Sequence, residues 1–98
     1  MTLAETRTVI KASIEPTKEK HGIEWLEATV NYCKDKADCY ELTIYISNNS
    51  RIKSAKELIY DNANEHMTKG AFELAVLKAL KEVGNDSKGI ARDYRPRG

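Results

Sequence analysis

The feature that most constrains the fold is the alternation of side-chain character through residues 25–47. Every second residue is apolar over 26–32, and the pattern resumes over 40–46 after a mostly polar segment, 34–38. A period of two is the period of a β-strand, because successive side chains leave opposite faces of the chain. The segment therefore predicts two strands joined by a hairpin loop.

The same alternation predicts the register of this hairpin. If Cys33 lies opposite Cys39, one face of the strand pair is continuously apolar and holds Leu26, Ala28, Val30, Tyr32, Tyr40, Leu42, Ile44 and Ile46. The other face then carries the polar residues together with Trp25 and Tyr45. A slip of one residue would mix the two sets, so the register is strongly specified.

A third strand is predicted upstream of the hairpin, over residues 6–14. Its alternation is weaker, but a two-stranded hairpin alone is only marginally stable in water and gains from a further strand. The following segment, 15–22, contains Pro16 and Gly22 and has no apolar periodicity. It predicts an exposed loop.

Two helices are predicted after the hairpin. The segment Ser54-Ala55-Lys56-Glu57 matches the capping-box pattern of a first helical turn, and apolar residues follow it at helical spacing. Residues 64–68 indicate a break, with Thr68 as the cap of a second helix. Residues 71–83 are almost entirely helix-forming, and Gly84 predicts the end of that helix.

These elements predict an α+β fold in the order β-β-β-α-α, in which two helices pack on one face of a three-stranded antiparallel sheet. The length suits one domain, which we expect to span residues 1–84. Residues 85–98 contain four basic and two acidic side chains, a net charge of +2. They predict a polar, mildly basic C-terminal tail.

Composition narrows the classes of protein to consider. The formal net charge is +1, from 16 Lys and Arg against 15 Asp and Glu, so bulk charge does not indicate a strongly basic nucleic-acid binder. The first residues show no secretory pattern, and no apolar stretch approaches the roughly 20 residues of a membrane span. We therefore expect a cytoplasmic protein with reduced thiols at Cys33 and Cys39, although their spacing leaves open whether they pair.

No catalytic or metal-binding motif stands out. The chain contains no Gly-x-Ser-x-Gly and no phosphate-binding glycine-rich loop. One cysteine pair with two distant histidines, His21 and His66, is poor support for zinc, which takes four ligands. The sequence predicts no enzyme, no cofactor and no metal.

Two surfaces are candidates for contact with a partner. Trp25 and Tyr45 share the outer face of the predicted sheet, where aromatic side chains can anchor a protein partner. The alternative, which we slightly favour for Trp25, is that the second helix or the loop before the hairpin covers this side chain. The helix over 71–83 has more apolar surface than one core-facing stripe needs, including Phe72, Val76 and Leu80. That surface either lies between the sheet and the other helix or meets a second copy or a partner.

The leading hypothesis is therefore a small non-enzymatic binding or regulatory protein, of the inhibitor or adaptor type. It would act through protein–protein contacts, and a homodimer is a further expectation. The alternative is a nucleic-acid-binding domain that uses the outer sheet face and basic or aromatic side chains elsewhere in the chain, namely Lys11, Arg92, Tyr94, Arg95 and Arg97. A short solvated basic end is the commoner explanation of the arginine-rich tail and is the one we favour.

Overall fold

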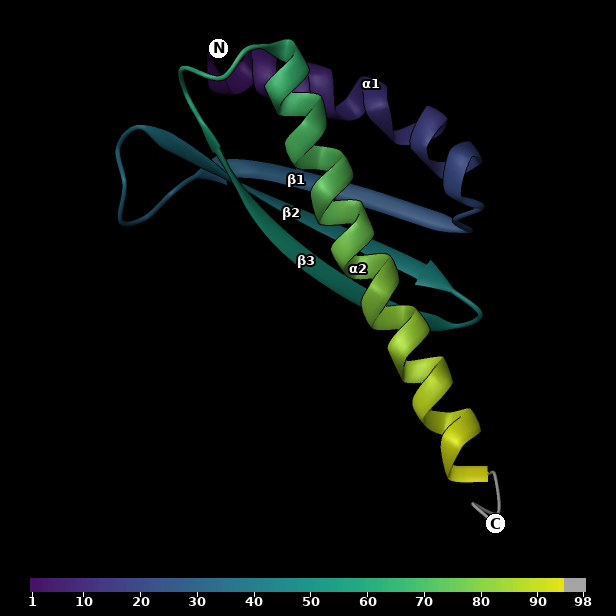
Figure 1. Ribbon diagram of the computed structural model, residues 1–98. Helices are drawn as coiled ribbons and strands as arrows, with labels where there is room; N and C mark the ends of the chain where they lie inside the picture. The colour runs from purple at the N-terminus through teal and green to yellow at the C-terminus, as the bar shows by residue number, and fades with distance from the viewer. Residues whose placement is uncertain (95–98) are drawn as a thin grey trace.

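The computed structural model describes the backbone of residues 1–94 and the side chains of residues 1–84. Its elements follow the order α1 (Leu3–His21), β1 (Trp25–Tyr32), β2 (Cys39–Asn48), β3 (Arg51–Tyr60) and α2 (Glu65–Tyr94) (Figure 1). The three strands form one antiparallel sheet in the order β1-β2-β3. The predicted α+β class is thus confirmed, whereas the predicted order of elements is wrong, because one helix precedes the sheet.

The predicted hairpin of β1 and β2 is confirmed with its register. Leu26 lies opposite Ile46, Val30 opposite Leu42, and the pairing continues to Tyr32 and Tyr40. Most of the apolar set faces the core, where Leu42, Ile44 and Ile46 are completely buried, whereas Tyr32 at the end of β1 is 70% exposed. The register is unambiguous because a slip of one residue would turn these apolar side chains to the other face of the sheet.

The predicted strand over residues 6–14 and the predicted loop over 15–22 are wrong, because α1 covers both. Thr2 and Glu5 form a capping box, in which the Glu5 amide donates to Thr2 Oγ1 (3.1 Å) and the Thr2 amide donates to Glu5 Oε1 (2.8 Å). Thr6 and Ile10 are buried one helical turn apart, which is the spacing of a helix face. Gly22 ends α1 in the left-handed conformation, with φ of 63°.

The predicted helix that begins at Ser54 is also wrong, because that segment is β3. Asn49 and Ser50 both have positive φ, 53° and 65°, and form the two-residue turn that reverses β2 into β3. The pairing of Ser54 with Tyr45 places it inside an antiparallel ladder. A capping-box sequence is a local preference only, and this sheet overrides it.

The second predicted helix exists, but it begins earlier and ends later than its sequence indicates. α2 starts at Glu65, where the side chain of Asn64 accepts a hydrogen bond from the Met67 amide (2.8 Å). Thr68, predicted as a cap, is buried in the first turn instead. The helix continues through Gly84, so the predicted stop there is wrong, and the domain boundary proposed at that position falls inside α2.

Both helices pack on the same face of the sheet. α1 contributes Ile10, and α2 contributes an apolar stripe that meets the inward-facing residues of the strands. That stripe consists of Phe72, Ala75, Val76, Ala79 and Val83. The opposite face of the sheet is therefore left without a helix over it in the described part of the chain.

Candidate partner-binding surface

The face of the sheet that neither helix covers is here called the outer face. Its side chains come from alternate positions of the three strands, and most of them are exposed. Thr43 and Cys39 are exceptions, since neighbouring strands flank both of them. An antiparallel sheet can keep one face solvated, but that face usually carries polar residues.

Three large apolar side chains gather at one end of the outer face. Trp25 and Ile52 lie on either side of Ser47, and Tyr45 precedes Ser47 by two residues on the same face. The exposed fractions are 40% for Trp25, 38% for Tyr45 and 66% for Ile52. We call these three residues the outer-face patch. Diagonal neighbours of this kind are close enough for long side chains to make one contact surface.

Hydrogen bonds fix the backbone next to this patch. The Glu24 amide donates to Asn48 Oδ1 (2.8 Å), and Glu24 Oε1 accepts from the Asn49 amide (3.0 Å). The residue before β1 is thereby tied to the turn between β2 and β3. Such a connection holds the patch in a preformed arrangement, which lowers the entropy lost on binding.

The charge of the outer face favours a neutral or weakly basic partner. It contains Glu27, Glu41 and Lys56, and thus one positive charge against two negative charges. The ammonium group of Lys56 lies 3.7 Å from the Glu41 carboxylate, so this single positive charge is partly neutralised and less available to an anionic partner. A polyanion such as nucleic acid needs an excess of lysine and arginine, and this face has a net charge of −1.

The predicted contact residues divide between surface and core. Trp25 and Tyr45 are on the outer face as predicted, and Ile52, which the sequence reasoning missed, joins them. Phe72 and Val76 are 1% and 0% exposed and belong to the core, so in this fold they are not available to a partner. Leu80 is half-buried against that core. Phe72 and Val76 therefore face the core, as in the first of the two alternatives for this helix, although the other helix expected beside it is β3.

The residues of the nucleic-acid alternative do not gather at one described site. Lys11 lies on α1, where it lines a hollow of about 490 Å³ along β1 with Arg7, Glu27 and others. The side chains of Arg92 and Tyr94 and the whole of Arg95 and Arg97 lie outside the described part of the chain. Lys11 alone can therefore be placed, and it is at the edge of the sheet.

Cys33, which directly follows β1, lies opposite Cys39 at the start of β2, as predicted. Both are free thiols, with a distance of 2.8 Å between the two sulfur atoms. The hydrogen bond that the thiols share, followed by desolvation, raises the pKa of Cys33 to about 11. A thiol with a raised pKa stays protonated near neutral pH and is a poor nucleophile.

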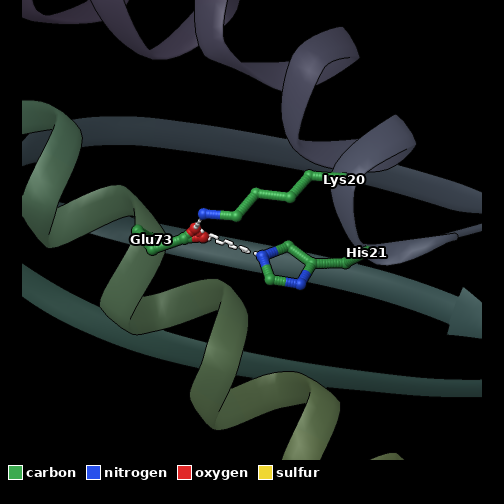
Figure 2. Close-up of polar contacts among 3 residues, drawn as sticks. All are labelled: Lys20, His21 and Glu73. Atoms are coloured by element: carbon green, nitrogen blue, oxygen red, sulfur yellow. Dashed lines mark hydrogen bonds and ion pairs between the residues drawn. The ribbon is translucent and has the colours of Figure 1, made fainter.

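The most connected polar cluster joins the two helices (Figure 2). The Glu73 carboxylate lies 2.8 Å from His21 Nε2 and 3.5 Å from Lys20 Nζ, so α2 is bound to the end of α1. The hydrogen bond from His21 lowers the pKa of Glu73. His21 is the last residue of α1, and its partner Glu73 is 52 residues away, so no local sequence pattern predicts their contact.

Glu73 also lines a hollow of about 500 Å³ between the helices, together with His66, Lys20 and Lys69. This hollow contains one carboxylate, which already contacts His21 and Lys20. Within the described residues, no group of three or more His, Cys, Asp or Glu side chains is arranged to hold a metal ion.

Comparisons with protein-family models, curated protein sequences and solved structures found no match to this chain. Among residues 1–94, neither helix is long and apolar enough to cross a membrane. The fold and the outer face are therefore the basis on which a function can be argued.

Proposed function

We propose that this chain is a small non-enzymatic binding or regulatory protein, of the inhibitor or adaptor type, that acts by placing its outer sheet face against a protein partner. The observation that carries the proposal is the outer-face patch, in which Trp25, Tyr45 and Ile52 remain exposed beside a completely buried core. Aromatic side chains at the centre of an interface commonly supply much of its binding energy.

The arrangement of titratable groups supports a non-enzymatic role. Glu73 is engaged by His21 and Lys20, and the Cys33 thiol has a raised pKa, so neither group is poised for reaction. An active site usually brings several perturbed groups together around one cleft. Here the polar clusters connect one element of the fold to another.

Nucleic-acid binding is the second candidate, and its support is confined to the basic residues near the C-terminus. The net charge of −1 on the outer face speaks against using that face for a polyanion. Retention of a labelled duplex and a labelled single strand on filters at two salt concentrations separates the candidates. Binding that weakens steeply with salt supports nucleic acid.

The test of the main proposal is affinity capture with the immobilised chain from the cells that produce it. We expect a defined partner protein to be retained by the native chain and lost when Trp25→Ala and Tyr45→Ala are combined. Met67→Ala is the matched control, because Met67 is 55% exposed but lies on α2, at the other face of the sheet. Equal capture by both variants would contradict a role for the patch.

A further inference from the structure

The two edges of the sheet differ in how their backbone is protected. At the β1 edge, Arg7 of α1 donates from Nε to the Val30 carbonyl (2.8 Å) and from a terminal nitrogen to Asn31 Oδ1 (3.1 Å). The β3 edge lies on the side of the sheet away from α1 (Figure 1). An exposed edge strand is a template for pairing with another chain unless something covers it.

The ladder determines which residues of β3 present their backbone to this edge. The Cys33 amide donates to the Cys39 carbonyl (3.4 Å) and the Asp61 amide to the Asp38 carbonyl (2.9 Å), which fixes the phase of both strand pairs. Antiparallel pairs alternate between bonded and non-bonded positions, so odd-numbered residues of β3 bond to β2. The outward amides and carbonyls are then those of Ile52, Ser54, Lys56 and Leu58.

We propose that β3 pairs with β3 of a second copy of this chain, antiparallel about a twofold axis at Ala55, to form a continuous six-stranded sheet. This register joins Ser54 to Lys56 of the other copy through the outward backbone groups. It also places Ile52 opposite Leu58, and symmetry repeats this contact. Both side chains are exposed in the single chain, at 66% and 38%, and both become covered.

Charge on the covered face fits the same register. Lys53 of one copy lies opposite Glu57 of the other, and the small Ala55 meets itself at the axis. Glu57 is already 2.7 Å from Lys78 of its own α2, so its carboxylate would lie between two ammonium groups. Opposite charges directly across a ladder stabilise a strand pair, and small residues allow close approach.

Other symmetric registers fit less well. A shift of one residue would bring outward groups against inward ones, so the backbone could not bond. A shift of two residues in one direction places Lys56 opposite Lys56 of the second copy, and a shift in the other direction places Ile52 opposite Lys56. Like charges directly opposite each other are destabilising. In the proposed register Lys56 faces Ser54 and keeps its contact with Glu41.

The proposed pairing uses both β3 edges, so these edges are closed after two copies. At each β1 edge, Arg7 already donates to the outward carbonyl of Val30, which leaves that acceptor unavailable to a further strand. The hollow of about 690 Å³ between β3 and α2, lined in part by Lys78 and Lys81, would lie at the new contact. The two outer faces would merge into one surface on which Trp25 and Tyr45 of both copies stay exposed, while Ile52 of each copy contacts Leu58 of the other.

The first test measures the mass of the full chain by sedimentation equilibrium between low and high micromolar concentrations. We expect the mass of two chains at the upper end. Ser54→Pro removes one outward amide from each copy and leaves the bonds to β2 intact, because proline is tolerated at an outward position of an edge strand. We expect it to weaken the dimer at least about tenfold. Ser54→Ala keeps the amide and is the matched control.

A second test restores pairing with complementary charges. Ile52→Glu and Leu58→Lys should each be monomeric alone, because each places a charge against an apolar side chain. Mixed in equal amounts they should form a heterodimer, since the introduced carboxylate then faces the introduced ammonium while the native Ile52 and Leu58 meet in the other half. Far-ultraviolet circular dichroism checks that both variants remain folded.

A native chain that stays monomeric at high micromolar concentration would overturn the inference. So would a dimer that Ser54→Pro leaves intact, or single variants whose mixture does not associate. The inference shares Ile52 with the outer-face patch but is tested separately from the proposed function, because capture of a partner is tested through Trp25 and Tyr45 on chains whose β3 edge is unchanged. Either proposal can fail while the other holds.

Discussion

The two faces of the sheet are made by the same three strands, yet they differ completely in what covers them. On one face Leu42, Ile44 and Ile46 have no exposed surface beneath the two helices. On the other face Trp25 and Tyr45 stay about two-fifths exposed. Because side chains alternate along a strand, consecutive residues such as Ile44 and Tyr45 have opposite roles. One face stabilises the fold, and the other is left free for contact.

This comparison shows why a small chain can expose aromatic residues without losing stability. The covered face gathers Ile10, with Leu3 and Ile14 packed against the core, from α1 and a full stripe from α2, so the core does not depend on the outer face. Burying a large apolar side chain contributes about 1.5–3 kcal/mol, and those contributions are concentrated on one side of the sheet. Trp25 and Tyr45 are therefore not needed for the core and can remain exposed to solvent.

The largest expected difference between the faces comes from truncating two neighbouring residues. Ile44→Ala should lower the free energy of unfolding by about 2–5 kcal/mol, because it leaves a cavity in the core. Tyr45→Ala should lower it by less than about 1 kcal/mol, because its side chain is already partly solvated. Urea denaturation of both variants measures the two values. Similar losses for the two would show that the outer face is covered in solution.

The next effect concerns the helix that supplies most of the covered face. Asn64→Ala removes the side chain that accepts a hydrogen bond from the Met67 amide at the start of α2. We expect the free energy of unfolding to fall by about 1 kcal/mol, as is typical for the loss of a helix cap. Asn62→Ala is a suitable control, because Asn62 is an exposed residue outside both β3 and α2. Equal losses would contradict the capping role.

The sequence predicted the covered face of β1 and β2 because its signal is local and redundant. Eight apolar positions agree on one register, and any slip exposes several of them at once. The signal for α1 was present as Thr2-x-x-Glu5, but β-branched residues at alternate positions between Thr6 and Ile14 imitate a strand. The burial of Thr6 and Ile10 is decided by the core, which the sequence does not display.

Like the fold, the candidate site could be predicted from the sequence only in part. Trp25 and Tyr45 followed from the hairpin register, and the structure places both on the outer face. Ile52 was missed because the capping-box match at Ser54 hid the alternation of β3, although the turn at Asn49-Ser50 could have indicated a hairpin. The contact of Glu73 with His21 joins segments whose proximity depends on the whole fold.

A smaller effect is expected where the two helices of the covered face are joined. Glu73→Gln removes the carboxylate that contacts Lys20 and His21, and should cost about 1 kcal/mol at neutral pH. The folded pKa of Glu73 is lowered, so this stabilisation is present above the unfolded pKa of about 4.3 and is lost as the pH falls through the folded pKa. The unfolding temperatures of native and variant chains should therefore converge in acid.

The control for this titration is Glu65→Gln. Glu65 lies 3.2 Å from Lys69 within α2, and both side chains are more than half exposed. Exposed pairs one helical turn apart contribute about 0.3–0.5 kcal/mol, so this variant should differ little from the native chain at any pH. A gap for Glu73→Gln that persists unchanged to pH 2 would contradict a role for its charge.

The smallest expected effect concerns two lysines that contact opposite faces of the sheet, Lys56 of β3 on the outer face and Lys78 of α2 on the covered face. Lys56 on the outer face is 3.7 Å from Glu41, and both side chains are well exposed, so Lys56→Gln should change the free energy of unfolding by less than about 0.5 kcal/mol. Lys78 of α2 is 2.7 Å from Glu57, which is only 22% exposed, so Lys78→Gln should cost more. Thermal unfolding at a concentration where sedimentation shows a single chain compares them. If Lys56→Gln proved the more costly change, the outer face would be less solvated than its exposed side chains indicate, and its availability to a partner would have to be reconsidered.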